Sequence, residues 1–282
     1  MNERTNSMRF GASLVLSLLL PGAATAQVQI QSGDTAVFGG GTRMIGLQAR
    51  NQQTGDFEAN IRFQVYQAAS ATVMPIGKPS EWKKLRVLAG QTVLETAPVK
   101  FPAVTAKSRI IVEWLNDENK VLGRTDAMVY PTNVLAGLKP LLQGGELGIW
   151  DPAGALKPSL QRNDIEFADL EEAGLADFHG RLAILGPFPS AAQTPEHLAR
   201  SIEKLIKKGM AVIWIQSPPP AGSRSKPSCY LVAAGKGAAV VVQPELMANF
   251  SDNPGAQEHF VEWCAWALNP ESPALPNPTR QP

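Results

Sequence analysis

The chain has 282 residues, of which 44% are hydrophobic and 18% charged, a globular composition with enough length for about two domains. Its formal net charge is +1, and the lysine and arginine residues are scattered along the sequence. This pattern excludes the strongly basic surface that nucleic-acid binding needs, so we expect no nucleic-acid partner.

The first 26 residues have the pattern of a secretory signal peptide. Arg4 and Arg9 form a basic region before an apolar run at residues 11–20, and residues 24–26 read Ala-Thr-Ala. This order predicts cleavage before Gln27 and a periplasmic or secreted protein. The apolar run is too short to span a bilayer as a helix, so we expect no membrane insertion after signal removal.

Residues 27–131 alternate between apolar and polar side chains with a period of two. Ile45, Leu47 and Ala49 show this alternation, and similar short runs recur between clusters of Gly, Pro, Asn and Asp. Several strands at this spacing predict an antiparallel Ig-like β-sandwich. The three glycines of VFGGGTR precede a strand rather than a helix, which favours a turn over a phosphate-binding loop.

The pattern changes after a linker or short helix predicted at residues 132–145. Apolar runs without alternation then predict buried strands in ELGIW, DIEFADL, RLAILGP, MAVIWI and AAVVVQ. TPEHLARSIEKLIKKG predicts a helix with Thr194 as its N-cap, and AQEHFVEWCAWALN predicts a final helix. Strands alternating with helices predict a doubly wound α/β domain over residues 146–269, followed by a disordered Pro-rich tail at 270–282.

Two cysteines, Cys229 and Cys264, are present in the whole chain. In an oxidising compartment they are candidates for one disulfide, and the alternative is two buried free thiols. Neither the cysteines nor the three scattered histidines have the spacing of metal ligands, so we expect no metal or cofactor.

Residues 146–269 resemble a class I glutamine amidotransferase-like domain, which has a flavodoxin-like fold. The resemblance lies in the order of LGIWDPAGALKPSLQRNDIEFADLEE, FHGRLAILGPFPS, an amphipathic helix and KKGMAVIWIQS. Together with the preceding β-region, the chain resembles uncharacterised exported bacterial proteins.

The resemblance implies a nucleophilic cysteine on a tight turn after the strand MAVIWI. In this chain Gln216 occupies that position, and its neighbour Ser217 lacks the flanking glycines of a nucleophile elbow. The only later histidine, His259, lies within the predicted final helix, so no His-x-Glu pair follows. We therefore expect no amidotransferase chemistry and no catalysis.

Weaker binding candidates lie where the predicted strands end, because α/β folds bind ligands at the carboxyl edge of the sheet. They are Asp151, Gly186, Phe188, Gln216 and Ser217. Asp151 is also a common turn opener, whose side chain caps its own backbone, and that interpretation is favoured.

These observations predict a non-catalytic accessory or scaffold protein that binds an unknown envelope protein or glycan. The β-sheet edges and the carboxyl edge of the α/β sheet are the expected docking surfaces. One alternative is a carbohydrate- or ester-active hydrolase with an unrecognised site at the carboxyl edge. Another is a glycan or small-ligand binder in the groove between the domains.

Overall fold

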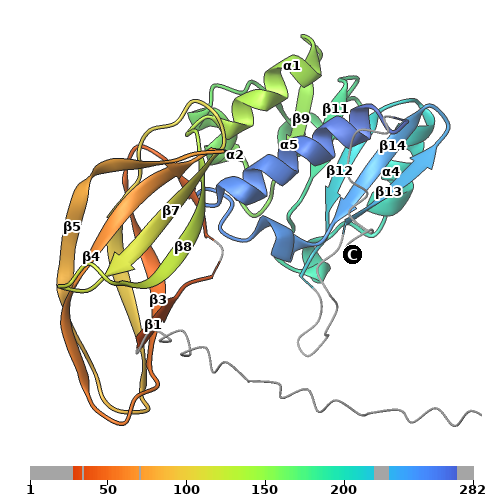
Figure 1. Cartoon of the computed structure of the whole chain (residues 1–282). Helices are drawn as coiled ribbons and strands as arrows, with labels where there is room; N and C mark the ends of the chain where they lie inside the picture. The colour runs from red at the N-terminus through yellow and green to blue at the C-terminus, as the bar shows by residue number, and fades with distance from the viewer. Residues whose placement is uncertain (1–27, 34, 70, 219–228, 272–282) are drawn as a thin grey trace, which may run out of the picture.

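The computed structural model describes residues 28–33, 35–69, 71–218 and 229–271. The predicted signal peptide and residues 272–282 of the predicted tail lie outside these ranges. The described residues form two β-sheets, and a short helical connection joins the first sheet to the second (Figure 1).

The first sheet contains eight strands in the order β5-β4-β7-β8-β1-β3-β6, with β2 paired to β8. The strands are β1 (Val28–Gln31), β2 (Thr35–Phe38), β3 (Thr42–Asn51), β4 (Phe57–Ala68), β5 (Val73–Val87), β6 (Thr92–Lys100), β7 (Ser108–Leu115) and β8 (Val121–Tyr130). Most neighbours are antiparallel, whereas β1 and β2 both pair with β8 in parallel. The sheet is curled, so that its two edge strands, β5 and β6, approach each other across an open seam (Figure 1).

One hydrophobic core fills the inside of this curl. The alternation in the sequence places Ile45, Leu47 and Ala49 on the inner face of β3. Trp114 is fully buried at the centre, where its ring centroid lies 5.5 Å from that of Phe63. The core is therefore enclosed by a single sheet that wraps around it.

The predicted Ig-like β-sandwich is wrong. A sandwich needs two separate sheets packed face to face, but strand pairing here runs without a break from β5 to β6. Alternation in a sequence reports that one face of each strand is buried. It does not report which strands are neighbours, and this is why it could not separate a sandwich from a curled sheet.

The second sheet follows a connection made of a 3-10 helix, η1 (Val134–Gly137), and α1 (Leu138–Leu142). Its strand order is β10-β9-β11-β12-β14-β13. The strands are β9 (Leu147–Trp150), β10 (Ala168–Asp169), β11 (Leu182–Leu185), β12 (Ala211–Ile215), β13 (Cys229–Ala234) and β14 (Gly237–Val242). The remaining helices are α2 (Lys157–Arg162), α3 (Leu170–Ala173), η2 (Ala191–Gln193), α4 (Leu198–Lys207), η3 (Pro244–Met247) and α5 (Pro254–Leu268).

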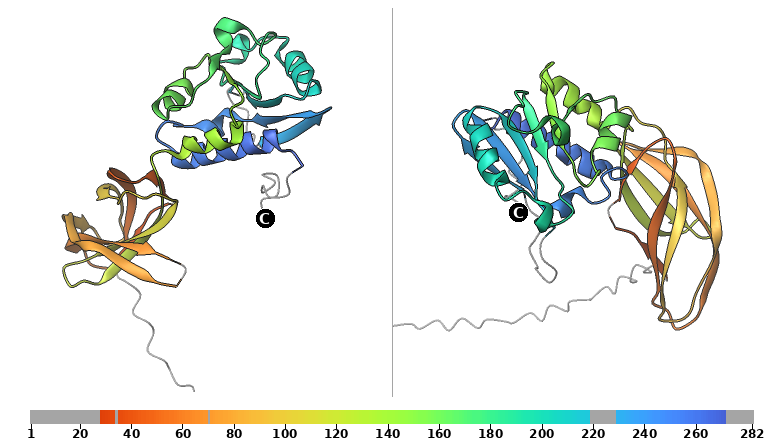
Figure 2. Two further views of the ribbon diagram at one scale, coloured as in Figure 1. Left: turned by 90° about the horizontal axis from the view of Figure 1, so that it is seen from above. Right: turned by 180° about the vertical axis from the view of Figure 1, so that it is seen from behind.

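Helices cover both faces of this second sheet (Figure 2). Residues of α1, α2 and α5 pack on the face that carries Ile184, Ile213 and Val240. Residues of α3 and α4 pack on the other face, which carries Leu185 and Val212. This double covering explains why the strands lack apolar-polar alternation.

The predicted doubly wound, flavodoxin- or amidotransferase-like domain is nevertheless corrected. The sheet is mixed, because β13 is antiparallel to β14 and forms an edge hairpin with it. In the described residues between β12 and β14 the chain passes through this edge strand, and no crossover helix is present. The strand predicted at DIEFADL is only two residues long in the structure, as β10.

The predicted helices are present with altered starts. The final helix, α5, buries Phe260, Trp263, Cys264 and Ala267, whose spacing of three and four residues puts them on one face of a helix. Helix α4 starts at Leu198 with His197 at its N-cap, so the N-cap predicted at Thr194 is wrong. The amino-terminal end of α5 lies against β2 of the first sheet. No helix among the described residues is long and apolar enough to cross a membrane.

Candidate functional site

An irregularity in edge strand β5 opens a cavity at the seam of the curled sheet. Phe63 of β4 pairs with Ser80, whereas Val65 pairs with Ile76, so residues 77–79 of β5 bulge opposite the single residue Gln64. The buried Gln64 side chain supports this bulge, because its Nε2 donates to the carbonyl oxygens of Ile76 (3.3 Å) and Gly77 (3.4 Å). Bulges of this kind bend a strand and often lie next to functional sites.

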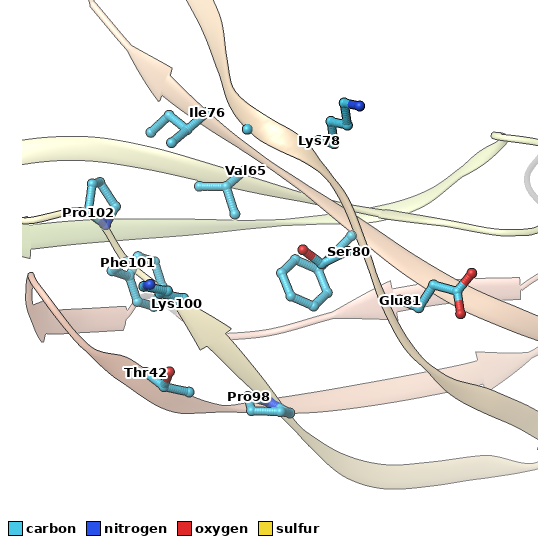
Figure 3. Close-up of a pocket in the computed structure, with 12 residues that line it drawn as sticks. Thr42, Val65, Ile76, Lys78, Ser80, Glu81, Pro98, Lys100, Phe101 and Pro102 are labelled. Carbon is cyan, nitrogen blue, oxygen red and sulfur yellow. The ribbon is translucent and has the colours of Figure 1, made fainter.

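The seam cavity has a volume of about 610 Å³ and an apolar floor with a polar rim (Figure 3). Its lining residues are Thr42, Phe63, Val65, Ile76, Gly77, Lys78, Ser80, Glu81, Pro98, Lys100, Phe101 and Pro102. Phe63, Val65 and Phe101 belong to the buried core, so the floor is fixed by packing. The rim carries two lysines, Lys78 and Lys100, and one glutamate, Glu81, so its net charge is positive.

The seam is closed beyond the cavity. Lys83 Nζ of β5 and Glu95 Oε2 of β6 form an ion pair of 2.6 Å across it, and Trp82 packs edge-on against Trp114, with ring centroids 5.6 Å apart. The sequence reasoning missed the cavity. The sequence feature that could have revealed it is the presence of Gly77 and Pro79 within an extended run, because glycine and proline in a strand mark bulges and edge strands.

The carboxyl edge of the second sheet contains another cavity, of about 590 Å³, between the ends of β12 and β14 and the start of α4. It brings together two predicted residues, Gln216 and Ser217, with Trp214 and Thr194. The hydroxyls of Thr194 and Ser217 are hydrogen-bonded to each other. No histidine lines this cavity among the described residues, so Ser217 has no imidazole base there.

Asp151 is a structural cap, as its favoured interpretation predicted. Its buried carboxylate accepts hydrogen bonds from the backbone N–H groups of Ala155 (3.0 Å), Leu156 (2.7 Å) and Lys157 (3.0 Å). These bonds satisfy donors at the start of α2 that have no helical partner. The carboxylate is thus engaged within the protein.

Gly186 and Phe188 are also committed to packing. A side chain at Gly186 would collide with the carbonyl oxygen of Ile215, since a Cβ there would lie 2.2 Å from it. Phe188 is 1% exposed and packs edge-on against Trp150, with ring centroids 5.9 Å apart. Its ring is therefore not accessible for stacking on a ligand.

A charged cluster lies near the ends of β9 and β10. Lys157 Nζ contacts Asp169 Oδ2 at 2.6 Å and Glu171 Oε1 at 2.7 Å. The hydrogen bond from Lys157 holds the pKa of Asp169 below its usual range. A glycosidase acid needs a raised pKa, so this carboxylate is unsuited to that role.

The candidate disulfide is not formed. Cys229 and Cys264 are both free and buried in the core between the second sheet and α5. Burial raises the pKa of the Cys229 thiol to about 11, which makes it a poor nucleophile. No group of three side chains suited to hold a metal ion occurs among the described residues.

Where the two parts meet, Tyr130 offers no free aromatic face for a ligand. This ring is 5% exposed, and Lys107 Nζ lies 5.0 Å from its centroid. Glu258 of α5 accepts hydrogen bonds from Tyr130 Oη (2.8 Å) and from Lys107 Nζ (2.7 Å). These contacts form a polar joint.

Comparison with known proteins assigns no family. No protein-family model matches the chain, and no curated protein matches it. Among solved structures, the alkylpurine DNA glycosylase AlkC from Pseudomonas fluorescens, bound to DNA containing an abasic site analog, aligns at 14% identity and a TM-score of 0.30, covering 38% of this chain and 31% of that one. The β-glucosidase EmGH1 from Erythrobacter marinus aligns at 9% identity and a TM-score of 0.28, covering 36% and 15%. The sporulation control protein Spo0M from Bacillus subtilis aligns at 10% identity and a TM-score of 0.27, covering 41% and 55%.

The chain spans less than two thirds of each of these proteins, and the TM-scores are too low to assign a fold or an activity. The prediction that the protein has no catalysis is nevertheless corrected. It rested on a missing cysteine and a missing His-x-Glu pair, and these absences bear on amidotransferase chemistry, not on other reactions.

Proposed function

We propose that the protein acts in the cell envelope by binding an extended segment of another protein at the seam between β5 and β6. The observation that carries this proposal is the bulge at residues 77–79, which opens an apolar-floored cavity beside the two edge strands. Export rests on the signal pattern of residues 1–26.

An extended peptide suits this place because edge strands carry backbone groups that have no partner within the sheet. A peptide that lies along such an edge forms main-chain hydrogen bonds, and its alternate side chains enter pockets. Proline has no N–H group to donate, and both edges contain it, as Pro75 and Pro79 in β5 and as Pro98 in β6, so main-chain pairing with the peptide is limited to the other residues of each strand.

The lining also limits the sequence of the segment. The buried floor of Phe63, Val65 and Phe101 suits one apolar side chain of the peptide. Lys78 and Lys100 are exposed on the rim, where they attract acidic residues that flank this side chain. The proposed partner segment is therefore extended, with an apolar anchor and acidic neighbours.

Site-specific photocrosslinking tests this proposal in the native envelope. A photoreactive residue at Ser80, which is exposed on the rim, is expected to capture one partner through a segment of the proposed composition. The same residue at Thr92, exposed on β6 and outside the cavity lining, serves as the control. Equal capture at both positions would contradict seam binding.

Two matched variants then measure affinity for the captured segment made as a peptide. Ser80→Trp blocks the mouth of the cavity and is expected to weaken binding at least about tenfold, whereas Thr92→Trp leaves it unchanged. Both positions are exposed, so neither substitution disturbs the core. If Ser80→Trp binds the peptide as tightly as the wild-type protein does, the seam is not the binding site.

The hydrolase alternative has no specific support in the described residues. Ser217 pairs with a threonine hydroxyl, and Asp169 and Glu171 both contact Lys157. We therefore propose no reaction.

A further inference from the structure

We infer that the cavity between β12, β14 and α4 is a second binding site, which takes a neutral polyhydroxylated ligand the size of a mono- or disaccharide. The cavity volume of about 590 Å³ lies within the range of small-ligand pockets. This site lies in the second sheet and is independent of the seam and of the function proposed for it.

The strongest indication is an unused hydrogen-bond donor on Trp214. The indole Nε1 is buried and has no partner in the structure, although the residue lines the cavity. A buried donor without an acceptor is unfavourable, and such groups in folded proteins call for an explanation. Nε1 is closed off from solvent, so a ligand oxygen supplies the missing acceptor once the indole turns toward the cavity that the residue lines.

The other polar groups of the lining are mainly neutral. Thr194 and Ser217 contribute a pair of hydroxyls, and Gln216 contributes an amide that both donates and accepts. Hydroxyl and amide groups match the alternating donors and acceptors of a sugar. The indole and the side chains of Pro195 and Leu198 add apolar surface for its C–H faces.

The charge of the lining argues against an anionic ligand. Glu196 is the one ionisable side chain among the described lining residues, and it is exposed. A phosphate or carboxylate ligand would meet this negative charge without a cation to offset it. A neutral ligand fits the lining best.

Regular structure holds the parts of this site in place. Trp214 lies within β12, which pairs with both β11 and β14. The backbone continues this pairing beyond the strand, because Gln216 N donates to the carbonyl oxygen of Val242 at 2.9 Å. The paired strands therefore fix the backbone positions of Trp214 and Gln216 in the cavity wall.

NMR of the full-length mature protein tests this inference directly. Each tryptophan gives its own indole N–H signal, and Trp214→Phe identifies the one of interest. Glucose, N-acetylglucosamine, maltose and cellobiose are titrated as probes, with acetate, inorganic phosphate and choline as charged comparators. At least one sugar is expected to shift the Trp214 signal, while the charged comparators leave it unchanged.

Two matched variants test whether the indole N–H of Trp214 contributes to sugar affinity. Trp214→Phe keeps an aromatic ring but removes the donor, so sugar affinity is expected to fall about tenfold. Trp150→Phe is the control, because Trp150 pairs with the same residue, Leu185, from the opposite side and does not line the cavity. The inference is overturned if no sugar shifts the signal, if a charged probe shifts it instead, or if both variants lose affinity equally.

Discussion

At the scale of single residues, the carboxylate of Asp151 fixes the turn between β9 and α2. It accepts three backbone hydrogen bonds while it is almost fully buried. We expect Asp151→Ala to lower the free energy of unfolding by about 2 kcal/mol, because it leaves buried donors without an acceptor. Urea denaturation measures this loss. Asp177→Ala, at an exposed position, should change stability by less than about 0.5 kcal/mol, and equal losses would show that the cap contributes nothing.

The two cysteines lead to a prediction about thiol chemistry. Burial raises the pKa of Cys229 to about 11 and also raises that of Cys264. Ellman's reagent is therefore expected to detect no thiol in the native protein near pH 8 and both thiols after denaturation without reductant. Finding neither thiol in the denatured protein would instead establish a disulfide.

The same burial makes stability depend on alkaline pH. The thiol has a pKa of 9.0 in the unfolded chain, whereas burial raises the pKa of folded Cys229 to about 11. The unfolded state thus binds fewer protons between these values, and the free energy of unfolding is expected to fall across this window. Cys229→Ser should reduce the fall, and an unchanged pH profile would contradict the assignment.

The candidate residues show how far sequence reasoning reaches at this scale. The turn at Asp151 was predictable because an Asp-Pro pair after an apolar run is a local signal. Phe188 was not, since only the three-dimensional packing against Trp150 shows that it is buried. Trp214 lies in the apolar run MAVIWI, which predicts a buried strand, and its unpartnered donor is visible only in the structure.

At the scale of elements, the β5 bulge depends on one glycine. Gly77 has a positive φ of 70°, which an L-residue with a side chain adopts at a cost of about 1 kcal/mol or more. Gly77→Ala is expected to lower stability by about this amount in urea denaturation. Gly46→Ala is the matched control, because a Cβ meets nothing within 4 Å at either position and Gly46 has no positive φ. A similar loss in both variants would mean that the backbone conformation of the bulge is unimportant.

Helices and strands were predictable where the sequence pattern that specifies them lies within the element itself. The stripe of α5 and the alternation of β3 each report which face is buried, and the structure has both elements. Strand neighbours were not predictable, because β1 pairs with β8 across more than ninety residues. That long-range parallel pairing helps to make one curled sheet of strands that locally look like those of a sandwich.

At the scale of the whole molecule, the two sheets are connected through Glu258. This residue of α5 accepts hydrogen bonds from Tyr130 and Lys107, both of which belong to the first part of the chain. These hydrogen bonds lie between two apolar cores that are separate from each other. Interfaces of this kind permit relative motion of the parts when their few contacts are lost.

A double-mutant cycle between Tyr130→Phe and Glu258→Gln measures this joint. The coupling energy is expected to be about 1 kcal/mol, because Tyr130 Oη and Glu258 Oε2 lie 2.8 Å apart and the ring is buried. Glu262→Gln provides the matched control, since Glu262 lies one turn further along α5 and pairs with His259 of the same helix. Its coupling to Tyr130→Phe should be close to zero. Small-angle X-ray scattering of Glu258→Gln should also show a larger radius of gyration than that of Glu262→Gln. If the two couplings are equal and both variants scatter like the wild type, the orientation of the sheets does not depend on Glu258, and the packing of α5 against β2 must set it.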